Sequence, residues 1–284
     1  MFLNVWLFLI LVLAQNESSK VSSPSIKKKS TSSHSAKKPS QRVPKNCEEV
    51  QNSGHNTSGI YKIQPKSSPK PFEAFCDMKN RDGGWTYFFN RFDGSVSFDR
   101  GWKDYKKGFG NLSGEFWLGL THLHELTADG KYQLLVELED WDKVKAYAHY
   151  NEFAIGSEKE GFSLKVLKHH SGDVEDSLMH SVGAKFSTKD KSHDEGTRIN
   201  CVERYRSAWW FKKCMLALLT GKYMKGKVTF HEMIKPMYWG SFHGNEYSLK
   251  KAKMMVKPIS KSYLQFIQTS DALKKHAYFL ASKH

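Results

Sequence analysis

The sequence lacks the motifs that most hydrolases and nucleotide-binding enzymes require. It has no Gly-x-Ser-x-Gly turn for a nucleophile, no Walker phosphate loop and no His-Glu-x-x-His pair. Residues 169–173 bring His, Ser and Asp together in sequence, but a catalytic triad needs partners that converge in space from separate parts of a fold. These absences predict a protein that is not an enzyme.

Cysteine is scarce, because only Cys47, Cys76, Cys201 and Cys214 occur among 284 residues. No Cys-x-x-Cys or His-x-x-x-His pair accompanies them, which disfavours a zinc site. In an oxidising compartment four cysteines predict two disulfide bonds, and three pairings are open. Pairing nearest neighbours would close loops of about 30 and about 14 residues, each contributing roughly 3 kcal/mol in the loop-entropy model.

Long apolar runs are missing beyond the first residues, which excludes a multi-span membrane protein. The one run at the start is too short to span a bilayer, and residues 12–14 put small or moderate side chains at the positions of a cleavage site. We predict that residues 1–14 are a secretory signal peptide and that the protein is secreted, the alternative being an uncleaved signal anchor. The sequons at Asn16, Asn56 and Asn111 fit this route as glycosylation sites.

Acidic residues are too few to balance the basic ones, at 29 against 44, which leaves a net charge of +15. The excess lies at the ends: residues 1–46 carry +7 and residues 222–284 carry +9, so the middle is nearly neutral. A domain-wide nucleic-acid surface is therefore a poor interpretation, and no nucleic-acid partner is expected.

The basic ends differ in composition from the rest of the chain. Residues 15–46 are rich in Ser and Lys without heptads or a Gly-x-y repeat, which predicts a disordered linker and excludes a coiled coil or collagen stalk. Residues 259–284 are predicted to form a basic C-terminal tail. Each end is interpreted either as a solvated segment or as a contact for sulfated glycans such as heparan sulfate.

The chain between the ends is punctuated by turn residues and short alternating segments. A helical turn or two is expected near residues 122–126. Short strands with few long helices predict an α+β domain built on an antiparallel sheet. The predicted strands cover residues 60–63, 72–76, 85–89, 116–120, 132–140, 146–150 and 162–166.

Motifs spread along residues 47–258 resemble the fibrinogen C-terminal domain family, and they occur in the family's order. The resemblance implies a central, twisted, mostly antiparallel sheet with short helices, a loop-rich ligand-binding subdomain and two disulfide bonds. The matching blocks are Ser58-Gly59-Ile60-Tyr61-Lys62-Ile63, Phe75-Cys76-Asp77-Met78, Gly83-Gly84-Trp85-Thr86, Arg91-Phe92-Asp93-Gly94-Ser95, Gly114-Glu115-Phe116-Trp117-Leu118-Gly119, Ala208-Trp209-Trp210 and Tyr247-Ser248-Leu249-Lys250.

The resemblance implies a calcium loop shortly before the third cysteine, where family members carry Asp-x-Asp-x-Asp. Calcium prefers six to eight oxygen ligands, so closely spaced carboxylates suit it. Here Asp190 and Asp194 are the candidate metal ligands, but Ser192 replaces the middle acid and the loop is about one residue longer than usual. Two alternatives follow: a loop that binds calcium, or a calcium-free loop held by hydrogen bonds in which Asp190 and Asp194 pair with nearby Lys or Arg. No other cofactor is expected.

The resemblance also implies a pocket near the last disulfide, which receives acetyl groups in fibrinogen-like lectins and a peptide amine in fibrinogen. The family pocket uses the peptide bond entering the fourth cysteine, here after Lys213 and often cis, and the next residue, here Met215 in place of His. Residues 217–223 and 233–234 depart from the family's polar pattern, which removes groups that would orient an acetyl group. The predicted pocket residues are Lys213, Cys214, Met215, Tyr223, Trp239 and Tyr247.

These patterns predict a secreted fibrinogen-related protein that acts by binding. The first hypothesis is lectin-like recognition of glycans or acetylated groups, as in innate immunity. The alternatives are a cell-surface receptor ligand similar to the angiopoietin-like proteins, and a protein that binds heparin or extracellular matrix through its basic ends. No stable membrane span is expected.

Overall fold

The computed structural model describes residues 42–129, 131–193, 200–229, 236–265 and 269. The predicted signal peptide, nearly all of the predicted linker including Asn16, and most of the predicted tail lie outside the described residues. Where the tail begins, residues 261–265 are helical, and the Tyr263 hydroxyl accepts a hydrogen bond of 2.9 Å from the Asn151 amide. No helix in the described ranges is both long and apolar enough to cross a membrane.

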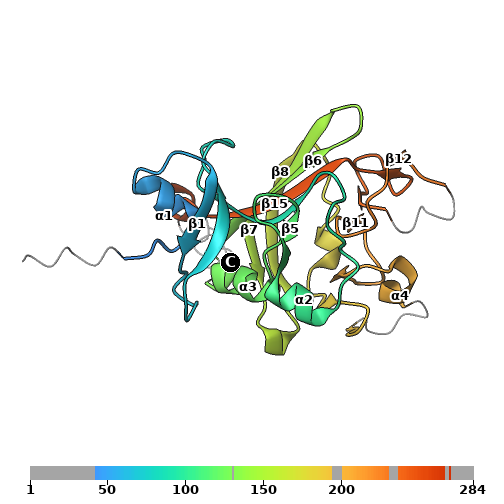
Figure 1. Cartoon of the computed structure of the whole chain (residues 1–284), viewed down its shortest axis with the longest axis horizontal. Helices are drawn as coiled ribbons and strands as arrows, with labels where there is room; N and C mark the ends of the chain where they lie inside the picture. The colour runs from blue at the N-terminus through green and yellow to red at the C-terminus, as the bar shows by residue number, and fades with distance from the viewer. Residues whose placement is uncertain (1–41, 130, 194–199, 230–235, 266–268, 270–284) are drawn as a thin grey trace, which may run out of the picture. The chain divides into compact units, whose positions relative to one another are not determined.

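One large antiparallel sheet forms the centre of the fold (Figure 1). Its strands run in the order β1-β2-β3-β15-β6-β7-β8, and the short β4 and β5 pair beside β3. These strands are β1 (Gly59–Ile63), β2 (Phe72–Asp77), β3 (Trp85–Arg91), β4 (Phe109–Gly110), β5 (Phe116–Trp117), β6 (Tyr132–Glu139), β7 (Lys145–Ile155), β8 (Leu164–Gly172) and β15 (Lys251–Pro258).

The last strand lies in the middle of this sheet. β15 pairs with β3 on one side and with β6 on the other, so that Met254 lies opposite both Phe89 and Val136. All three side chains are fully buried, and each removes apolar surface from water. β15 therefore lies at the centre of the sheet although it is the last strand in the sequence, after all the segments that follow β8.

Within the described residues, α1 to α4 and two short 3-10 helices lie before or between the strands, in addition to the helical residues 261–265. The helices are α1 (Cys47–Asn52), α2 (Trp102–Lys107), α3 (Leu120–Thr127), η1 (Glu158–Glu160), η2 (Met179–Ser181) and α4 (Cys201–Tyr205). Leu120, Leu123 and Leu126 of α3 are buried at three-residue spacing, which gives that helix its apolar face. The predicted strand over residues 116–120 is shorter than expected, because Gly119 at φ +111° turns the chain into α3.

In a second region, residues 188–250, the described parts (188–193, 200–229 and 236–250) contain little regular backbone beyond α4 and very short strands. Its strands are two residues long: β10 (Trp209–Trp210), which pairs with β9 (Phe186–Ser187), then β11 (Ala217–Leu218), β12 (Gly226–Lys227), β13 (Tyr238–Trp239) and β14 (Tyr247–Ser248). In Figure 1, α4, β11 and β12 lie at one end of the large sheet, whereas α1 and β1 lie at the other.

An aromatic cluster joins the two regions. Trp117 of β5 is 1% exposed, and its indole N–H donates to the Tyr105 carbonyl at 3.0 Å. Its ring lies within about 5 to 6.5 Å, centroid to centroid, of five other aromatic rings. These rings belong to Phe88, Phe89, Tyr105, Phe186 and Trp210.

Candidate functional site: a basic pocket beside the second disulfide

Two disulfide bonds support the fold, and they join nearest neighbours in the sequence. Cys47 pairs with Cys76 and ties α1 to β2, with a Cα–Cα distance of 5.2 Å. Cys201 pairs with Cys214 and ties α4 to the segment before β11, with a Cα–Cα distance of 5.3 Å. The predicted pairing is confirmed, and the second bond anchors Cys214, next to Lys213 and Met215 of the predicted pocket.

The segment around the fourth cysteine has an unusual backbone. Lys213 and Cys214 both adopt positive φ, at 49° and 69°, and the N–H of Lys212 donates to the Cys214 carbonyl at 2.8 Å. Non-glycine residues in this conformation are uncommon and cost free energy, so the surrounding structure must hold them. The peptide bond between Lys213 and Cys214 is trans.

The six predicted pocket residues do not converge on one cavity. Trp239 is completely buried, and its indole N–H donates to the Glu175 carbonyl at 3.2 Å, so its ring presents no face to a ligand. Tyr247 stacks on His243 and accepts a hydrogen bond of 3.0 Å from the Trp141 backbone N–H. The Lys213 side chain is exposed to solvent, Met215 lines one pocket, and Tyr223 lines another.

The first of these, the Met215 pocket, has a volume of about 450 Å³. Met215, the exposed Leu216 and Tyr238 line it together with the turn at residues 240–245 and the segment at residues 175–177. The Asp176 carboxylate is already hydrogen bonded to the Tyr150 hydroxyl at 2.6 Å. This pocket offers an aliphatic wall and few free donors.

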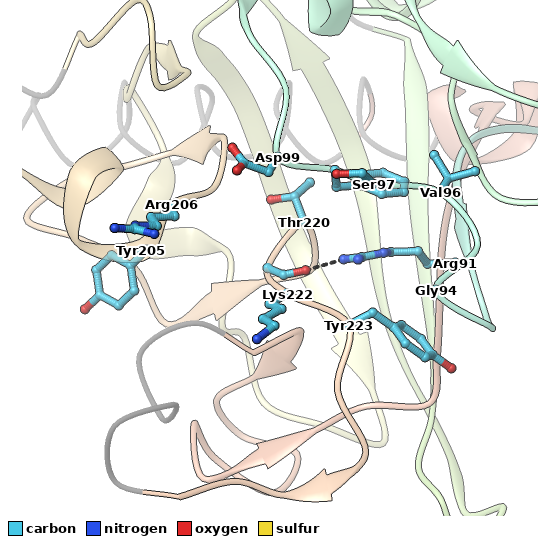
Figure 2. A pocket seen from close by; sticks show the side chains of 12 residues that line it. Arg91, Gly94, Val96, Ser97, Asp99, Tyr205, Arg206, Thr220, Lys222 and Tyr223 are labelled. Carbon is cyan, nitrogen blue, oxygen red and sulfur yellow. Dashed lines mark hydrogen bonds between the residues drawn. The ribbon is translucent and has the colours of Figure 1, made fainter.

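The second, which we call the Arg91 pocket, has a volume of about 440 Å³ (Figure 2). Four segments far apart in sequence line it: the end of β3 at Arg91, the loop at residues 94–99, the end of α4 at residues 205–206, and residues 220–223. The volume lies within the range of pockets that hold small ligands. It lies one short helix away from the second disulfide, because Cys201 begins α4, Tyr205 ends it and Arg206 is its C-cap.

Arg91 is the buried cation of this pocket, and it is 3% exposed. One guanidinium nitrogen, Nη1, donates to the carbonyls of Leu219 and Gly221, and the guanidinium lies 4.4 Å from the ring centroid of Phe98. Burial lowers the pKa of Arg91 to about 10, although the nearby carboxylate of Glu115 acts in the opposite direction. Arg91 is therefore charged at neutral pH and holds residues 219–221 in place.

Glu115, immediately before β5, fixes the loop on the other side of the pocket. Its carboxylate accepts four backbone hydrogen bonds of 2.6 to 3.1 Å, and it is 1% exposed. Hydrogen bonds to an ionised acceptor are stronger than neutral ones, so this arrangement holds the turn firmly. The four donors are the N–H groups of Phe92, Asp93, Gly94 and Val96.

Tyr223 closes the same side of the pocket. Its hydroxyl contacts the carbonyls of Phe92 and Lys250 at 2.8 and 2.9 Å, and burial raises the pKa of this phenol. Gly94 has φ +74°, and a Cβ there would lie 2.5 Å from the Tyr223 ring, so only glycine fits this position.

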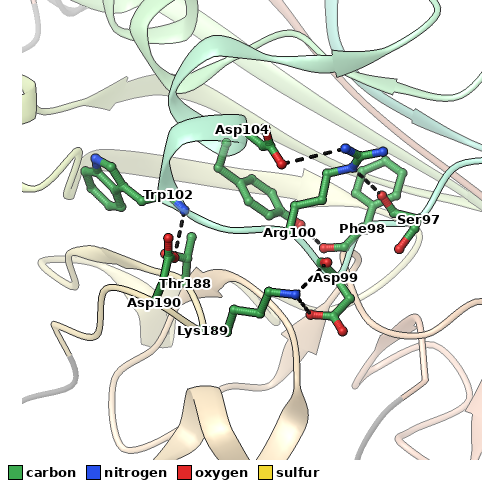
Figure 3. A network of polar contacts seen from close by, with 10 residues as sticks. Ser97, Phe98, Asp99, Arg100, Trp102, Asp104, Thr188, Lys189 and Asp190 are labelled. Atoms are coloured by element: carbon green, nitrogen blue, oxygen red, sulfur yellow. Dashed lines mark hydrogen bonds and ion pairs between the residues drawn. The ribbon is translucent and has the colours of Figure 1, made fainter.

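A polar network continues from the rim of the pocket (Figure 3). Asp99, on the rim, forms an ion pair of 3.0 Å with Lys189. Asp190 accepts hydrogen bonds from the Trp102 backbone N–H at 2.8 Å and the Thr188 hydroxyl at 2.7 Å. Burial alone would raise the pKa of Asp190, but these hydrogen bonds hold it below its usual value.

The calcium prediction falls on this network. Asp190 faces the segment at residues 101–102, and Asp194 lies outside the described residues. Within the described ranges, no group of three or more His, Cys, Asp or Glu side chains could hold a metal ion. The described residues thus do not fit a calcium site of six or more oxygens, and calcium binding stays a prediction.

Sequence reasoning missed most of the Arg91 pocket. Of its residues, Tyr223 alone was among the predicted pocket residues. Arg91 was identified only as part of a family block, although a charged residue at the end of a strand as apolar as residues 85–89 is itself a signal of a special role.

Of the predicted glycosylation sites, Asn56 and Asn111 are both exposed, as a modified side chain requires.

The chain belongs to the family defined by the C-terminal globular domain of fibrinogen beta and gamma chains, whose model matches residues 43–259. It is 42% identical to mouse fibrinogen C domain-containing protein 1 over 219 residues, which are 75% of this chain and 47% of that protein. It is 37% identical to human angiopoietin-related protein 2 over 214 residues, 75% of this chain and 43% of that protein. The matched region therefore makes up about half the length of these curated relatives.

Solved structures agree with this assignment. The fibrinogen-like globe domain of human ANGPTL2 is 38% identical, with a TM-score of 0.73, and the match covers 76% of this chain and all of that one. Lamprey fibrin D-dimer, complexed with the peptide ligand Gly-His-Arg-Pro-amide, is 30% identical with a TM-score of 0.71, covering 81% of this chain and 79% of that one. The predicted family and fold class are confirmed.

Proposed function

We propose that this chain is a secreted binding protein that recognises glycans in the manner of a lectin, and that it does so at the Arg91 pocket. It works by holding a ligand and not by catalysis. Secretion is supported by the apolar run at residues 2–14, and by the two disulfides, which persist in oxidising compartments.

One observation carries this proposal: the pocket combines an aromatic ring, an exposed hydroxyl and charged donors in a rigid frame. Tyr205 is half-buried, Ser97 is exposed, and Arg206 and Lys222 are exposed on the same pocket. A few well-placed polar groups beside an apolar surface give a small-ligand site its specificity. The Met215 pocket has fewer such groups, which makes it the weaker candidate for a polar sugar.

A glycan array tests the proposal with two matched variants of the full chain. Tyr205→Ala removes the aromatic wall of the Arg91 pocket, whereas Leu216→Ala shortens an exposed side chain at the Met215 pocket. We expect wild-type protein and Leu216→Ala to retain the same glycans, and Tyr205→Ala to lose them. If only Leu216→Ala loses glycan binding, the glycan site is the Met215 pocket. If the wild-type protein binds no glycan on the array, the lectin hypothesis is refuted.

A second candidate function is that of a cell-surface receptor ligand. The match that covers the whole ANGPTL2 globe domain and the aliphatic wall of the Met215 pocket support it. Cell binding that soluble sugars do not compete, and that Leu216→Ala weakens, would favour this function. Binding that needs only sulfate and disappears by about 0.5 M salt would instead favour heparin or matrix binding through the basic ends.

A further inference from the structure

We infer that the Arg91 pocket selects sugars that carry an anionic group, a carboxylate or a sulfate, and that Arg206 and Lys222 contact this group. The inference rests on the proposed glycan recognition, and it names the class of sugar. Neither residue was among the predicted pocket residues.

The charges that face the pocket are unbalanced. Arg91, Arg206 and Lys222 are its three cations, and Asp99 is the one acid among its lining residues. Asp99 is paired with Lys189, outside the pocket. Two further acids lie close to the pocket: Glu115, whose carboxylate accepts the four N–H groups of the turn at residues 92–96, and the exposed Asp93, whose carboxylate accepts a hydrogen bond of 2.9 Å from the Ser95 N–H.

Arg206 and Lys222 form no ion pair with any residue that the structure describes, whereas Asp99 on the rim is paired with Lys189. Figure 2 places Arg206 on one side of the pocket and Lys222 on the segment across from it. Two cations that line one concave surface without a protein counter-charge attract an anion.

The backbone at both cations is fixed before any ligand arrives. Arg206 ends α4 at φ +44°, and its N–H donates to the Val202 carbonyl at 2.9 Å, while the other end of α4 is held by the disulfide at Cys201. The Lys222 carbonyl accepts from the Met237 N–H at 3.0 Å. Because the backbone needs no ordering on binding, a charged contact loses less entropy there.

Arg91 acts as a positioning residue and not as a ligand contact. Its Nη1 bonds go to the carbonyls of Leu219 and Gly221, directly before Lys222, and its Nε is buried without a hydrogen-bond partner in the described structure. Its charge adds to the positive potential of the pocket, while its hydrogen bonds fix the segment that carries Lys222.

An anionic sugar fits the pocket better than an acidic peptide does. The lining segments of this pocket are loops, a helix end and the end of β3, so the pocket offers no free sheet edge to pair with an extended peptide. Tyr205 offers an aromatic ring for the face of a sugar, and Ser97 offers an exposed hydroxyl. Tighter binding of an acidic peptide than of an anionic sugar would contradict this choice of ligand.

Calorimetry on the full chain tests the inference with three related sugars: lactose, lactose sulfate and sialyllactose. We expect the two anionic sugars to bind at least about 10-fold more tightly than lactose at 0.15 M salt. If lactose sulfate gains as much as sialyllactose, the pocket accepts either anion. If sialyllactose alone gains affinity, the group selected is the carboxylate only where Arg206→Gln/Lys222→Gln abolishes the gain; a gain that survives in this variant comes from the N-acetyl group of sialyllactose and overturns the inference. The absence of acetyl groups from lactose sulfate separates charge selection from acetyl recognition.

The double variant Arg206→Gln/Lys222→Gln should lower the affinity for the anionic sugars by about 10-fold to about 100-fold, a larger factor than it lowers the affinity for lactose. The matched control Lys225→Gln/Lys227→Gln removes the same charge from exposed lysines outside the pocket and should change neither. Unchanged melting temperatures would show that both variants fold.

Four further results would overturn the inference. Equal affinity for all three sugars would leave glycan recognition intact but remove the charge selection. An equal loss in the control variant would assign the effect to general surface charge. Tighter binding of a polyglutamate peptide than of either anionic sugar would assign the pocket to acidic peptides, whereas failure of every sugar and of the peptide would refute the proposed function as well.

Discussion

The large sheet and the loop region at residues 188–250 bury aromatic side chains equally well but hold their backbones by different means. In the sheet, strands as long as the 11 residues of β7 pair through ladders of backbone hydrogen bonds. In the loop region the strands are two residues long, yet Trp209, Trp210 and Trp239 are completely buried. A loop region can therefore have a dense core without regular backbone.

In the loop region, side chains donate the hydrogen bonds that main-chain carbonyls would receive from a neighbouring strand in a sheet. Arg91 and Tyr223 donate to main-chain carbonyls between the two regions, and Trp239 donates to the Glu175 carbonyl. Such bonds satisfy buried carbonyls while they leave the loop surface free of neighbouring strands. Binding sites are commonly built on loops that a rigid scaffold holds, and the Arg91 pocket has this arrangement.

The largest expected effect comes from the aromatic cluster that joins the two regions. Trp117→Ala should lower the free energy of unfolding by about 3 to 5 kcal/mol, because it removes a fully buried ring and leaves a cavity. Urea denaturation followed by fluorescence measures this loss. A loss below about 1 kcal/mol would show that the two regions do not depend on the cluster.

Both disulfides are expected to stabilise the fold, but only the second is expected to support glycan binding. Replacing either pair by alanine, Cys47→Ala/Cys76→Ala or Cys201→Ala/Cys214→Ala, should cost about 3 kcal/mol of unfolding free energy under oxidising conditions. We expect the second double variant alone to lose glycan binding at temperatures where both variants are folded, because it frees α4 from the pocket segment. Loss of binding in both would mean that the sheet region supports the pocket directly.

Glu115 joins a strand of the sheet to the wall of the pocket. Glu115→Gln keeps the shape of the side chain but removes the charge that accepts four N–H groups, so we expect a loss of about 2 kcal/mol. Thermal unfolding of the variant checks this value, with Glu158→Gln on the exposed η1 as a control that should change stability little. Equal effects of the two substitutions would contradict the role assigned to Glu115.

The smallest expected effect is the pH dependence contributed by Asp77 of β2. Burial would raise the pKa of Asp77, but hydrogen bonds from the Lys79 and Asn80 N–H groups and from the Tyr87 hydroxyl hold it below its usual value. A pKa lower in the folded than in the unfolded state means that the stability is present above about pH 4 and is lost as pH falls through the folded pKa. Asp77→Asn should flatten the loss of stability below pH 4 in urea denaturation, and a slope identical to that of wild type would refute it.

Calcium affinity tests whether the missing acid or the loop length limits the loop at residues 190–194. Ser192→Asp restores a carboxylate at the middle position, so calorimetry should detect stronger calcium binding than in wild type. An unchanged titration would identify the longer loop as the obstacle.

Local patterns predicted the sheet well because alternation is a property of neighbouring residues. The expected strands at residues 60–63, 72–76, 85–89 and 132–140 are confirmed, with ends within a few residues of those observed. The position of β15 was not predicted, because its pairing with both β3 and β6 depends on contacts across more than a hundred residues. The family resemblance supplied the fold class that local patterns alone left general.

The pocket was less predictable for the same physical reason. Arg91 and Gly221 lie 130 positions apart in the sequence, and a hydrogen bond from the Arg91 side chain to the Gly221 carbonyl joins them. Because every residue has a main-chain carbonyl, the sequence gives no sign of which one accepts this bond. The resemblance identified Tyr223, but it also grouped Tyr223 with Trp239, which the structure buries. Residues that match a family motif predict the path of the backbone more reliably than they predict which side chains are accessible to a ligand.

Hydrogen–deuterium exchange of the full chain, with and without lactose sulfate, tests most directly whether the Arg91 pocket is the binding site. We predict slower exchange on binding at residues 91–99 and 220–223 and at the end of α4, with no change at residues 240–245 beside Met215. Protection confined to residues 213–216 and 240–245, or no protection anywhere at saturating sugar, would contradict it.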